Sequence, residues 1–338
     1  MQNAAILYKK LLEPSENVVA DISKLDGDIM ILGAGGKMGP DLARLAQNAV
    51  LKAGIKKKVI AVARFSEPQL KEELGEQGIE TIVADLLDDN QLQQLPEVKN
   101  VLFLAGNKFG TTGNESFTWA MNAYLPGRVT EKFRSSRIVV FSSGNVYPMS
   151  PVTAGGLSED HPPKPNGEYA QSCLGRERLF EYGSLKYKTP VLIYRLNYAN
   201  DVSYGVLLEI AKSVMNGSPI DLTMGHVNVI WQGDANEMAL RSLLHCSTPP
   251  KILNITGPEL ASVKWIAEEF GKLLNKKPLF INEEKTTALL SNAAEAFKLF
   301  GYPRVTLKQM IELLSEWLLT GGKTINKPTH FQEREGNY

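Results

Sequence analysis

A glycine-rich loop near the start of the chain has the residue types that bind a pyrophosphate. An apolar run at residues 29–32 leads straight into it, and helical spacing begins at Asp41. Glycines at this point allow a tight strand-to-helix turn and bring backbone N–H groups close to a phosphate. Such a cluster can be a plain turn, but its place in an alternating α/β pattern favours dinucleotide binding. The predicted cofactor-binding residues of this loop are Gly33, Gly35, Gly36, Lys37, Met38 and Gly39.

The end of the second apolar run, at residues 59–63, bears on which dinucleotide the loop holds. An acidic residue there accepts hydrogen bonds from the ribose 2′-OH and repels a 2′-phosphate, whereas an arginine does the reverse. The run ends in Arg64-Phe65-Ser66, with no carboxylate in place. We therefore expect NADP, held by Arg64 and Ser66. If Arg64 is only a solvated loop residue stacked on the adenine, NAD remains possible.

The elements that must position these residues alternate along the chain. Strand-like apolar runs lie at 29–32, 59–63, 79–83, 101–105, 138–142 and 191–195, and helix-compatible segments lie between them at 41–53, 67–74, 89–95, 115–133 and 171–182. Apolar strands that alternate with helices indicate a parallel sheet covered on both faces. The expected fold class is α/β: a Rossmann doubly wound parallel sheet over residues 27–197 and 225–256, with a further strand at 252–255.

Two later segments and both ends of the chain break this alternation. Residues 198–224 and 257–320 have helical spacing at 204–215, 262–274, 286–300 and 306–319, and we expect them to form a smaller, mainly helical C-terminal substrate lobe. Residues 1–26 have the pattern of a helical arm. Residues 321–338 are polar and contain glycine, which predicts a loosely held tail.

Several motifs together resemble those of a known family. Gly33, Gly36 and Gly39 have the G-x-x-G-x-x-G spacing of short-chain dehydrogenase/reductases, and Tyr169 stands where their catalytic tyrosine lies. The resemblance is to the extended branch, the NAD-dependent epimerase/dehydratase type, and it covers most of the chain. The other segments that carry it are Val83-Ala84-Asp85-Leu86, Leu102-Phe103-Leu104-Ala105-Gly106, Ser142-Ser143-Gly144-Asn145-Val146-Tyr147, Arg195-Leu196-Asn197 and Trp231-Gln232-Gly233-Asp234.

The resemblance implies roles for individual residues. Tyr169 would exchange a proton with the substrate, Ser143 would orient the substrate oxygen, and Asn122 would serve as a structural or catalytic asparagine. Further cofactor contacts would come from Asp85, Leu86, Leu104, Ala105, Gly106, Tyr169 and Cys173. Substrate contacts would come from Ser143, Asn145, Asn197 and Trp231, although Trp231 is as readily a core residue.

One position departs from the family pattern. The family has a lysine four residues after the tyrosine, where it binds the nicotinamide ribose and lowers the tyrosine pKa; this chain has Cys173 there. Arg176 and Lys164 are the alternative cations in the sequence, but neither spacing reproduces the position of the lysine. Cys173 has no evident histidine partner, which favours a small buried helix residue over a thiol nucleophile.

Two functions stay open because of this substitution. The first is an NAD(P)-dependent epimerase, dehydratase or reductase whose tyrosine uses another cation or needs little activation. We prefer it because Ser143 and Tyr169 are both present. The second is an NADP-binding protein with weak or lost catalysis, acting as a sensor or a partner subunit. Binding of NADPH without turnover would favour the second.

The substrate lobe lacks the cations that a nucleotide sugar would need. Relatives that act on nucleotide sugars place an arginine shortly before the late aspartate, where this chain has Val227 before Asp234. No arginine occurs between Arg195 and Arg241, and Lys212 is the only lysine there. A substrate diphosphate would lack its bidentate partners. The sequence therefore favours a free sugar, a sugar acid or another polyol-like carbonyl compound.

The composition argues against several other classes of protein. Lys plus Arg and Asp plus Glu are equal at 37 each, which gives no electrostatic reason to expect a nucleic-acid or anionic-membrane partner. Cys173 and Cys246 cannot form a disulfide framework, and no Cys/His cluster has metal-ligand spacing. The chain has neither a signal-peptide pattern nor an apolar run long enough to span a membrane. We expect a cytoplasmic protein with a small-molecule substrate and no metal, and leave a homodimer open.

Overall fold

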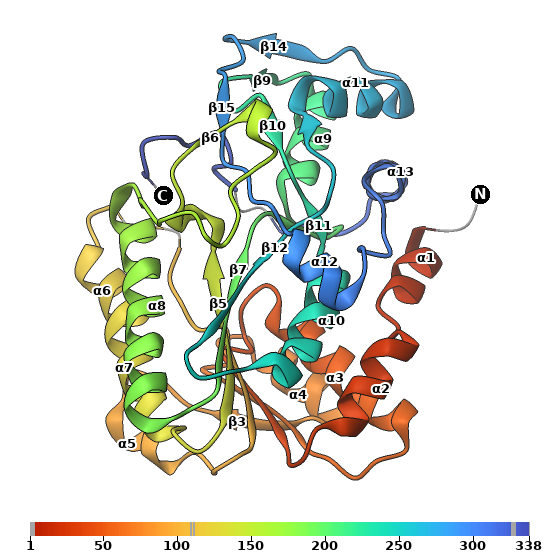
Figure 1. Ribbon diagram of the computed structural model, residues 1–338. Coiled ribbons are helices and arrows are strands. Elements are labelled where there is room, and N and C mark those ends of the chain that lie inside the picture. Colours follow the sequence, from red (N-terminus) through yellow and green to blue (C-terminus); the bar gives the residue numbers. More distant parts are fainter. Residues whose placement is uncertain (1–3, 109, 111, 326–328, 338) are drawn as a thin grey trace.

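A parallel β-sheet forms the centre of the molecule (Figure 1). The structure is a computed structural model and describes residues 4–108, 110, 112–325 and 329–337. The sheet has seven strands in the order β12-β7-β5-β4-β1-β2-β3, and every neighbouring pair is parallel. This order is that of a doubly wound Rossmann sheet with one added strand, which confirms the expected fold class. The strands are β1 (Ile29–Leu32), β2 (Val59–Ala63), β3 (Glu80–Val83), β4 (Asn100–Phe103), β5 (Arg137–Ser143), β7 (Val191–Leu196) and β12 (Lys251–Ile255).

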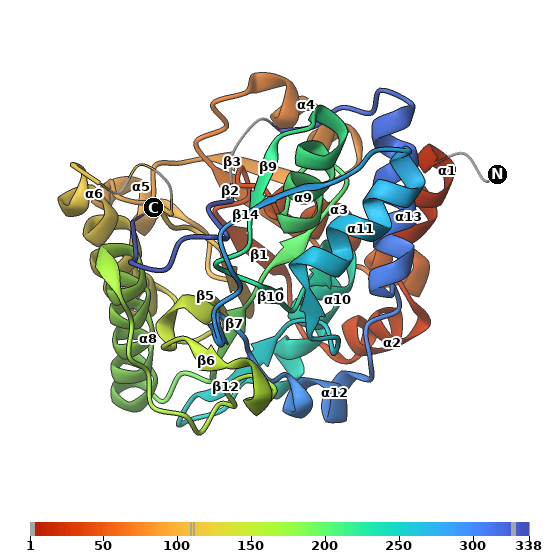
Figure 2. The ribbon, with the colours of Figure 1, turned by 90° about the horizontal axis from the view of Figure 1, so that it is seen from above.

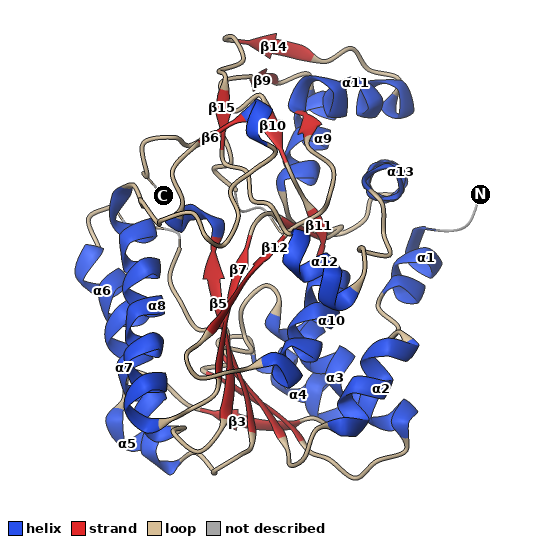
Figure 3. Cartoon of the chain, viewed as in Figure 1, coloured by secondary structure: helices blue, strands red, loops and turns tan. Residues whose placement is uncertain are grey.

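The central strands are apolar at successive residues because helices cover both faces of the sheet (Figure 3). In β1, Ile29 and Ile31 pack with one group of helices, whereas Met30 and Leu32 face the other group. The first group is α2 (Glu16–Lys24), α3 (Gly39–Ala53), α4 (Pro68–Glu76), α10 (Gln232–Ser242) and α12 (Ala294–Phe300); the second is α5 (Asp89–Gln94), α7 (Leu125–Lys132) and α8 (Gly167–Tyr187).

The N-terminal arm consists of two helices that dock on different parts of the molecule. In α2, Val18 and Ile22 are buried in the core beside the sheet, and the preceding Ser15 donates a 2.6 Å hydrogen bond from Oγ to Glu237 of α10. The first helix, α1 (Ala4–Leu11), lies beside α13 (Leu307–Leu319) (Figure 1), where the Tyr8 and Trp317 ring centroids are 5.6 Å apart. The arm therefore bridges the Rossmann sheet and the C-terminal lobe.

The C-terminal lobe has its own core, built around α9 (Val206–Asn216), α11 (Val263–Leu274) and α13. The bounds of these helices agree with the predicted segments, but the prediction of a helix over 286–300 is wrong for its first half. There, β15 (Thr287–Ala288) pairs antiparallel with β6 (Ser150–Pro151), and only α12 is helical. Pairing with a distant segment overrides the local helical spacing. Among the described residues, no helix is both long enough and apolar enough to cross a membrane.

The expectation of a loosely held C-terminal tail is wrong for residues 329–337. Thr329 donates a backbone hydrogen bond to Glu209 of α9, and the Phe331 side chain is buried in the core of the C-terminal lobe. Arg334 donates from Nη2 to Thr287 Oγ1 at 2.6 Å. Gly336 then packs against Gly167, at the start of α8, so that the tail runs from the C-terminal lobe to the first turn of α8 (Figure 2).

Candidate active site

The strand order places the cofactor loops at the carboxyl edge of the sheet between β1 and β4. The chain reverses direction across the sheet at this pair, and ligands of doubly wound sheets bind in the crevice formed there. Gly33, which follows β1, has a φ of +90°, and a Cβ at that position would lie 2.6 Å from the backbone nitrogen of Ala105, which follows β4. Only glycine therefore fits where the two loops meet.

The glycine loop ends in a helix N-terminus suited to a phosphate. A Cβ at Gly39 would lie 2.5 Å from the Ala34 carbonyl oxygen, so the glycine lets α3 begin close against the loop. The N-cap residue Met38 forms no side-chain hydrogen bond with the first turn of α3. The first backbone N–H groups of a helix have no partner within the helix, and they carry a partial positive charge. These residues fit the pyrophosphate of a dinucleotide.

Lys37 lies between the glycine loop and the C-terminal lobe. Its Nζ is 3.2 Å from the centroid of the Tyr204 ring, which precedes α9. A cation over an aromatic ring is stabilised by the ring quadrupole. The loop therefore contacts the lobe that closes over it.

Gly36 allows the phosphate role to be tested without disturbing the fold. A Cβ at this residue would approach only the Gly33 carbonyl oxygen, at an ordinary 3.5 Å. We expect Gly36→Val to fold but to weaken dinucleotide binding about tenfold to 150-fold, as calculated for one lost charge-assisted hydrogen bond of about 1.5–3 kcal/mol. Titration calorimetry with NADP and NAD measures the effect. Gly75→Val in α4, where a Cβ meets nothing within 4 Å, is the matched control; unchanged affinity in folded Gly36→Val would contradict the assignment.

The residues that follow β2 alternate between exposed and buried side chains. Phe65 has a φ of +47° and is buried, whereas the side chains of Arg64 and Ser66 on either side of it are exposed. The first carboxylate after β2 is Glu67, which is the N-cap residue of α4. Phe65 anchors the loop, and Arg64 is left accessible to a ligand.

The remaining predicted cofactor residues occupy the ends of β3 and β4. Asp85 accepts a 3.0 Å hydrogen bond from the Leu87 backbone N–H, which shapes the turn after β3, while Leu86 and Ala105 are buried and Leu104 is half-buried. Residue 106 is a glycine for a separate, structural reason: a Cβ there would lie 2.4 Å from Arg176 Nη2. All five residues lie at the carboxyl edge of the sheet.

The structure brings the predicted catalytic residues together. Ser143 ends β5, and Tyr169 lies in the first turn of α8, where it packs against Cys173 and interacts with the side chain of Ser143. Asn145 joins this group, since Ser143 Oγ donates to Asn145 Oδ1 at 2.8 Å. Burial and the adjacent Cys173 raise the Tyr169 pKa well above its usual value, whereas Arg176 and the neighbouring Ser143 side chain act to lower it.

Asn122 takes part as a structural residue beneath the site. It is fully buried in a π-helical turn (Ala120–Tyr124), and all of its carboxamide is used. Its Oδ1 accepts hydrogen bonds from the Asn107 N–H and from Arg176, and its Nδ2 donates to the Asn107 carbonyl and to Ser172 Oγ. Asn122 therefore holds the loop after β4 against α8.

The two other predicted substrate residues differ in where they lie. Asn197 is buried below Gly144, where a Cβ would be 3.0 Å from Asn197 Oδ1, and its Nδ2 donates to Asn228 at 2.9 Å. Trp231 is only 1% exposed and packs edge-to-face on Tyr8 in the core of the C-terminal lobe. The structure therefore places Asn197 beside the Ser143 segment and does not bring Trp231 into this group.

Two cations near Tyr169 were not predicted as site residues: Lys108 was missed, and Arg176 was weighed as an alternative cation but set aside because of its spacing. Lys108, in the loop after β4, has its Nζ 5.7 Å from the centroid of the Tyr169 ring, and burial lowers its pKa to about 8. Arg176 is buried in α8 and lowers the pKa of both Tyr169 and Cys173. The position of Lys108 shortly after the Leu104-Ala105-Gly106 segment was the available signal.

A buried ion pair fixes the framework behind these residues. Glu177 of α8 accepts two hydrogen bonds from Arg195 of β7, at 2.9 and 2.7 Å, and a third from Ser142 at 2.6 Å. Arg195 also donates to the Tyr147 hydroxyl, which in turn donates to Asn254 of β12. The network joins β5, α8, β7 and β12, and so sets the position of α8 relative to Ser143.

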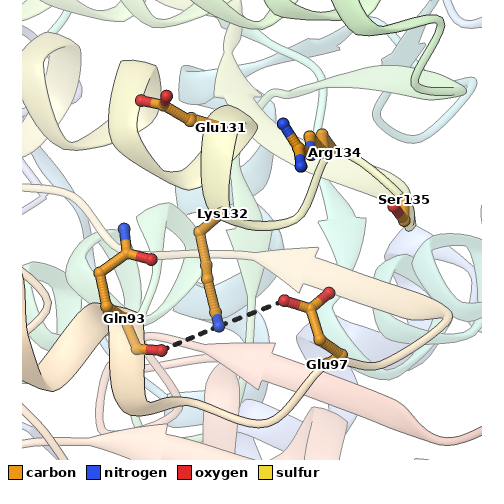
Figure 4. Close-up of a pocket in the computed structure, with 6 residues that line it drawn as sticks. All are labelled: Gln93, Glu97, Glu131, Lys132, Arg134 and Ser135. Carbon is orange, nitrogen blue, oxygen red and sulfur yellow. Dashed lines mark hydrogen bonds and ion pairs between the residues drawn. The ribbon is translucent and has the colours of Figure 1, made fainter.

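A hollow elsewhere on the surface is separate from this site (Figure 4). It has a volume of about 370 Å³, and Lys132 donates across it to the Gln93 carbonyl and pairs with Glu97. Its other lining residues are Glu131, Arg134 and Ser135. These residues precede β4 and β5, so the hollow lies at the amino edge of the sheet, opposite the glycine loop.

Comparison with solved structures finds the same fold in sugar-nucleotide epimerases. The UDP-glucuronic acid 4-epimerase of Bacillus cereus, a variant solved with a fluorinated substrate analogue and NAD, is 20% identical with a TM-score of 0.71, over 87% of this chain and 99% of that one. The UDP-glucose 4-epimerase of Thermus thermophilus, solved with NAD, is 17% identical with a TM-score of 0.69, over 86% and 98%. An epimerase from Methanothermobacter thermautotrophicus is 18% identical with a TM-score of 0.73, over 90% and 96%. At these identities the likeness is one of fold.

The sequence also matches a family model. No curated protein sequence matches the chain at a significant level. The model of the NAD dependent epimerase/dehydratase family matches residues 29–208, just over half of the chain. The match spans the glycine loop, the Ser143 segment and Tyr169, and it confirms the resemblance inferred from the motifs. The chain therefore belongs to the NAD dependent epimerase/dehydratase family.

Proposed function

We propose that the protein is an NADP-dependent enzyme of epimerase, dehydratase or reductase type that acts on a small sugar-like or polyol substrate. The observation that carries the proposal is the placement of Ser143 and Tyr169 beside each other, at the carboxyl edge of a sheet whose switch point holds a glycine loop. A protein that only bound a dinucleotide would need the loop but not the pair.

The two side chains divide the work on the substrate oxygen. A bound nicotinamide supplies or accepts the hydride. Tyr169 gives a proton to the substrate oxygen or takes one from it, and Ser143 holds that oxygen through its hydroxyl. The Asn145 backbone N–H donates to Ser143 Oγ, and Ser143 donates to Asn145 Oδ1. Both contacts hold the Ser143 hydroxyl in place beside Tyr169.

The proposed substrate is small because two later arginines of the chain already have partners. Arg304 pairs with Asp234 and Glu237, and Arg334 donates to Thr287 and to the Thr223 carbonyl. A diphosphate would have to displace these contacts, since its binding depends on charge-assisted, often bidentate, hydrogen bonds. Two of the solved relatives are epimerases of UDP-sugars, and we propose that this chain shares their fold but takes a substrate without a diphosphate.

NADP is the proposed cofactor because Arg64 is exposed at the end of β2 and no carboxylate stands beside it. We expect NADP(H) to raise the melting temperature more than NAD(H) at equal concentration, and Arg64→Asp to abolish or reverse the order. Differential scanning fluorimetry measures both. Glu67→Gln is the control, because it tests whether the nearest carboxylate contributes. Equal stabilisation of the wild type by the two cofactors would reject NADP specificity.

The presence of Cys173 at the position of the motif lysine supports a second candidate function. If the loss of the motif lysine has left Tyr169 inert, the protein is an NADP-binding sensor or partner subunit. Saturable NADPH binding without turnover on a broad panel of carbonyl compounds and polyols would favour this function.

A further inference from the structure

The Tyr169 hydroxyl lies in a setting that opposes its ionisation, and Cys173 gives it no positive charge. The thiol is fully buried and packs beside the tyrosine. In the described part of the chain, the charged or titratable groups that face Tyr169 are Cys173 and Arg176 from its own helix, Lys108 from the loop after β4, and Tyr147. A functional acid or base at this position therefore needs its cation from Arg176 or Lys108.

Arg176 reaches the site although its position in the sequence is seven residues beyond Tyr169. Residues 169, 173 and 176 share one face of α8, since positions three and four apart are neighbours on a helix. Helical side chains also lean toward the N-terminus, so the long arginine side chain extends back toward Cys173. Its Nη1 donates to the Phe141 carbonyl at 2.6 Å and its Nη2 to Asn122 Oδ1 at 2.7 Å.

The charge of Arg176 is not neutralised by a carboxylate. Both hydrogen-bond acceptors are neutral, and no acidic side chain in the described part of the chain lies within ion-pair distance of its guanidinium. The adjacent Glu177 is bound to Arg195 and Ser142. Arg176 is only 6% exposed, and its Nε is buried without a hydrogen-bond partner. A buried, unpaired cation is costly, and in a low-dielectric setting its field stabilises negative charge nearby.

We infer that the Arg176 guanidinium, about two turns beyond Tyr169 along α8, provides the electrostatic support of the Tyr169 phenolate that Cys173 cannot provide at the position of the motif lysine. The inference rests on the proposed role of Tyr169. Arg176 is a positioning residue: it acts through Tyr169 and, through Asn122, on the loop that carries Lys108. Gly106 supports the assignment, because only a residue without a Cβ leaves room for the guanidinium.

The test measures ionisation at position 169 directly and does not depend on catalysis. Difluorotyrosine, whose phenol is more acidic than that of tyrosine, is placed at residue 169 and titrated by fluorine NMR. Removing a nearby cation destabilises the phenolate, so Arg176→Gln should raise the pKa by about one unit or more. Arg176→Lys keeps the positive charge, so the pKa should stay close to that of the wild type. Arg178→Gln is the matched control, because Arg178 lies on the exposed face of the same helix and pairs with Glu181.

Rescue makes the test specific. In the Arg176→Gln background, Cys173→Lys returns a cation to the family position and should bring the pKa back down. Arg176→Met is the second neutral variant if Arg176→Gln does not fold. An unmoved pKa in a folded neutral variant would overturn the assignment, and so would a larger rise in Lys108→Met than in Arg176→Gln. If the wild type is inert on every substrate while the Arg176 shift is present, the proposed enzyme function fails and the electrostatic assignment stands.

Discussion

Tyr169→Phe is expected to lower kcat by about 100- to 10,000-fold, the range that a positioned general acid or base contributes. The substitution removes one hydroxyl from a side chain whose ring packs with Val146, Tyr147 and Cys173, so the fold and the glycine loop should be unaffected. Steady-state kinetics on the best substrate, together with NADPH affinity and the melting temperature, measure the effect. The hydroxyl lies beside the side chains of Ser143 and Cys173, and its loss should change affinity for the cofactor far less than kcat.

The pH dependence of the wild type provides a second check on the same residue. Burial raises the Tyr169 pKa well above its usual value, so the fraction ionised increases as the pH rises. In the direction that needs a base, activity should increase on the alkaline side, and Tyr169→Phe should remove that increase. Tyr182→Phe, at an exposed tyrosine of the same helix, is the control. Wild-type kinetics in Tyr169→Phe would exclude Tyr169 as the proton-transfer group.

Glu177→Ala is expected to have the largest effect on stability, about 3–5 kcal/mol of the free energy of unfolding, because it leaves Arg195 buried and unpaired. Both side chains are at most 3% exposed. Chemical denaturation measures the loss. Glu295→Ala is the matched control, since the exposed Glu295–Lys298 pair should contribute at most about 1 kcal/mol. A loss from Glu177→Ala no larger than that of the control would contradict the role of the ion-pair network in holding α8.

The parts of the fold that depend on local pattern could be predicted from the sequence. Six apolar runs separated by helical spacing predict the parallel sheet, and the structure confirms it. The failures lie where contacts between distant segments decide the conformation. Residues 287–288 pair with residues 150–151 in place of continuing a helix, and Arg334 anchors a polar tail on Thr287. Neither contact leaves a periodic signal in the sequence.

Part of the candidate site could also be predicted from the sequence. Ser143, Asn145 and Tyr169 were selected from motif positions, and the structure brings them together with Cys173. Arg176 was set aside because residue spacing alone does not show that a long side chain leans back along its helix.

Trp231 and Asn122 show that the local sequence does not reveal the role of a buried residue. A tryptophan beside a predicted cleft and one packed on Tyr8 in a core have the same sequence context. The four hydrogen bonds of the Asn122 carboxamide could be assigned only after the loop after β4 and α8 were placed in space.

The central claim is that this chain transfers a hydride with the help of Tyr169. A single-turnover experiment tests it most directly: the protein is mixed with stoichiometric NADP, or NADPH, and a panel of free sugars, sugar acids and polyols, and the near-ultraviolet absorbance of the reduced nicotinamide is followed. Epimerase, dehydratase and reductase chemistry all change this signal within one turnover. We expect a saturable change with at least one substrate, and we expect Tyr169→Phe to abolish it. Tight, saturable NADPH binding with no change on any substrate would contradict it and identify a binding protein.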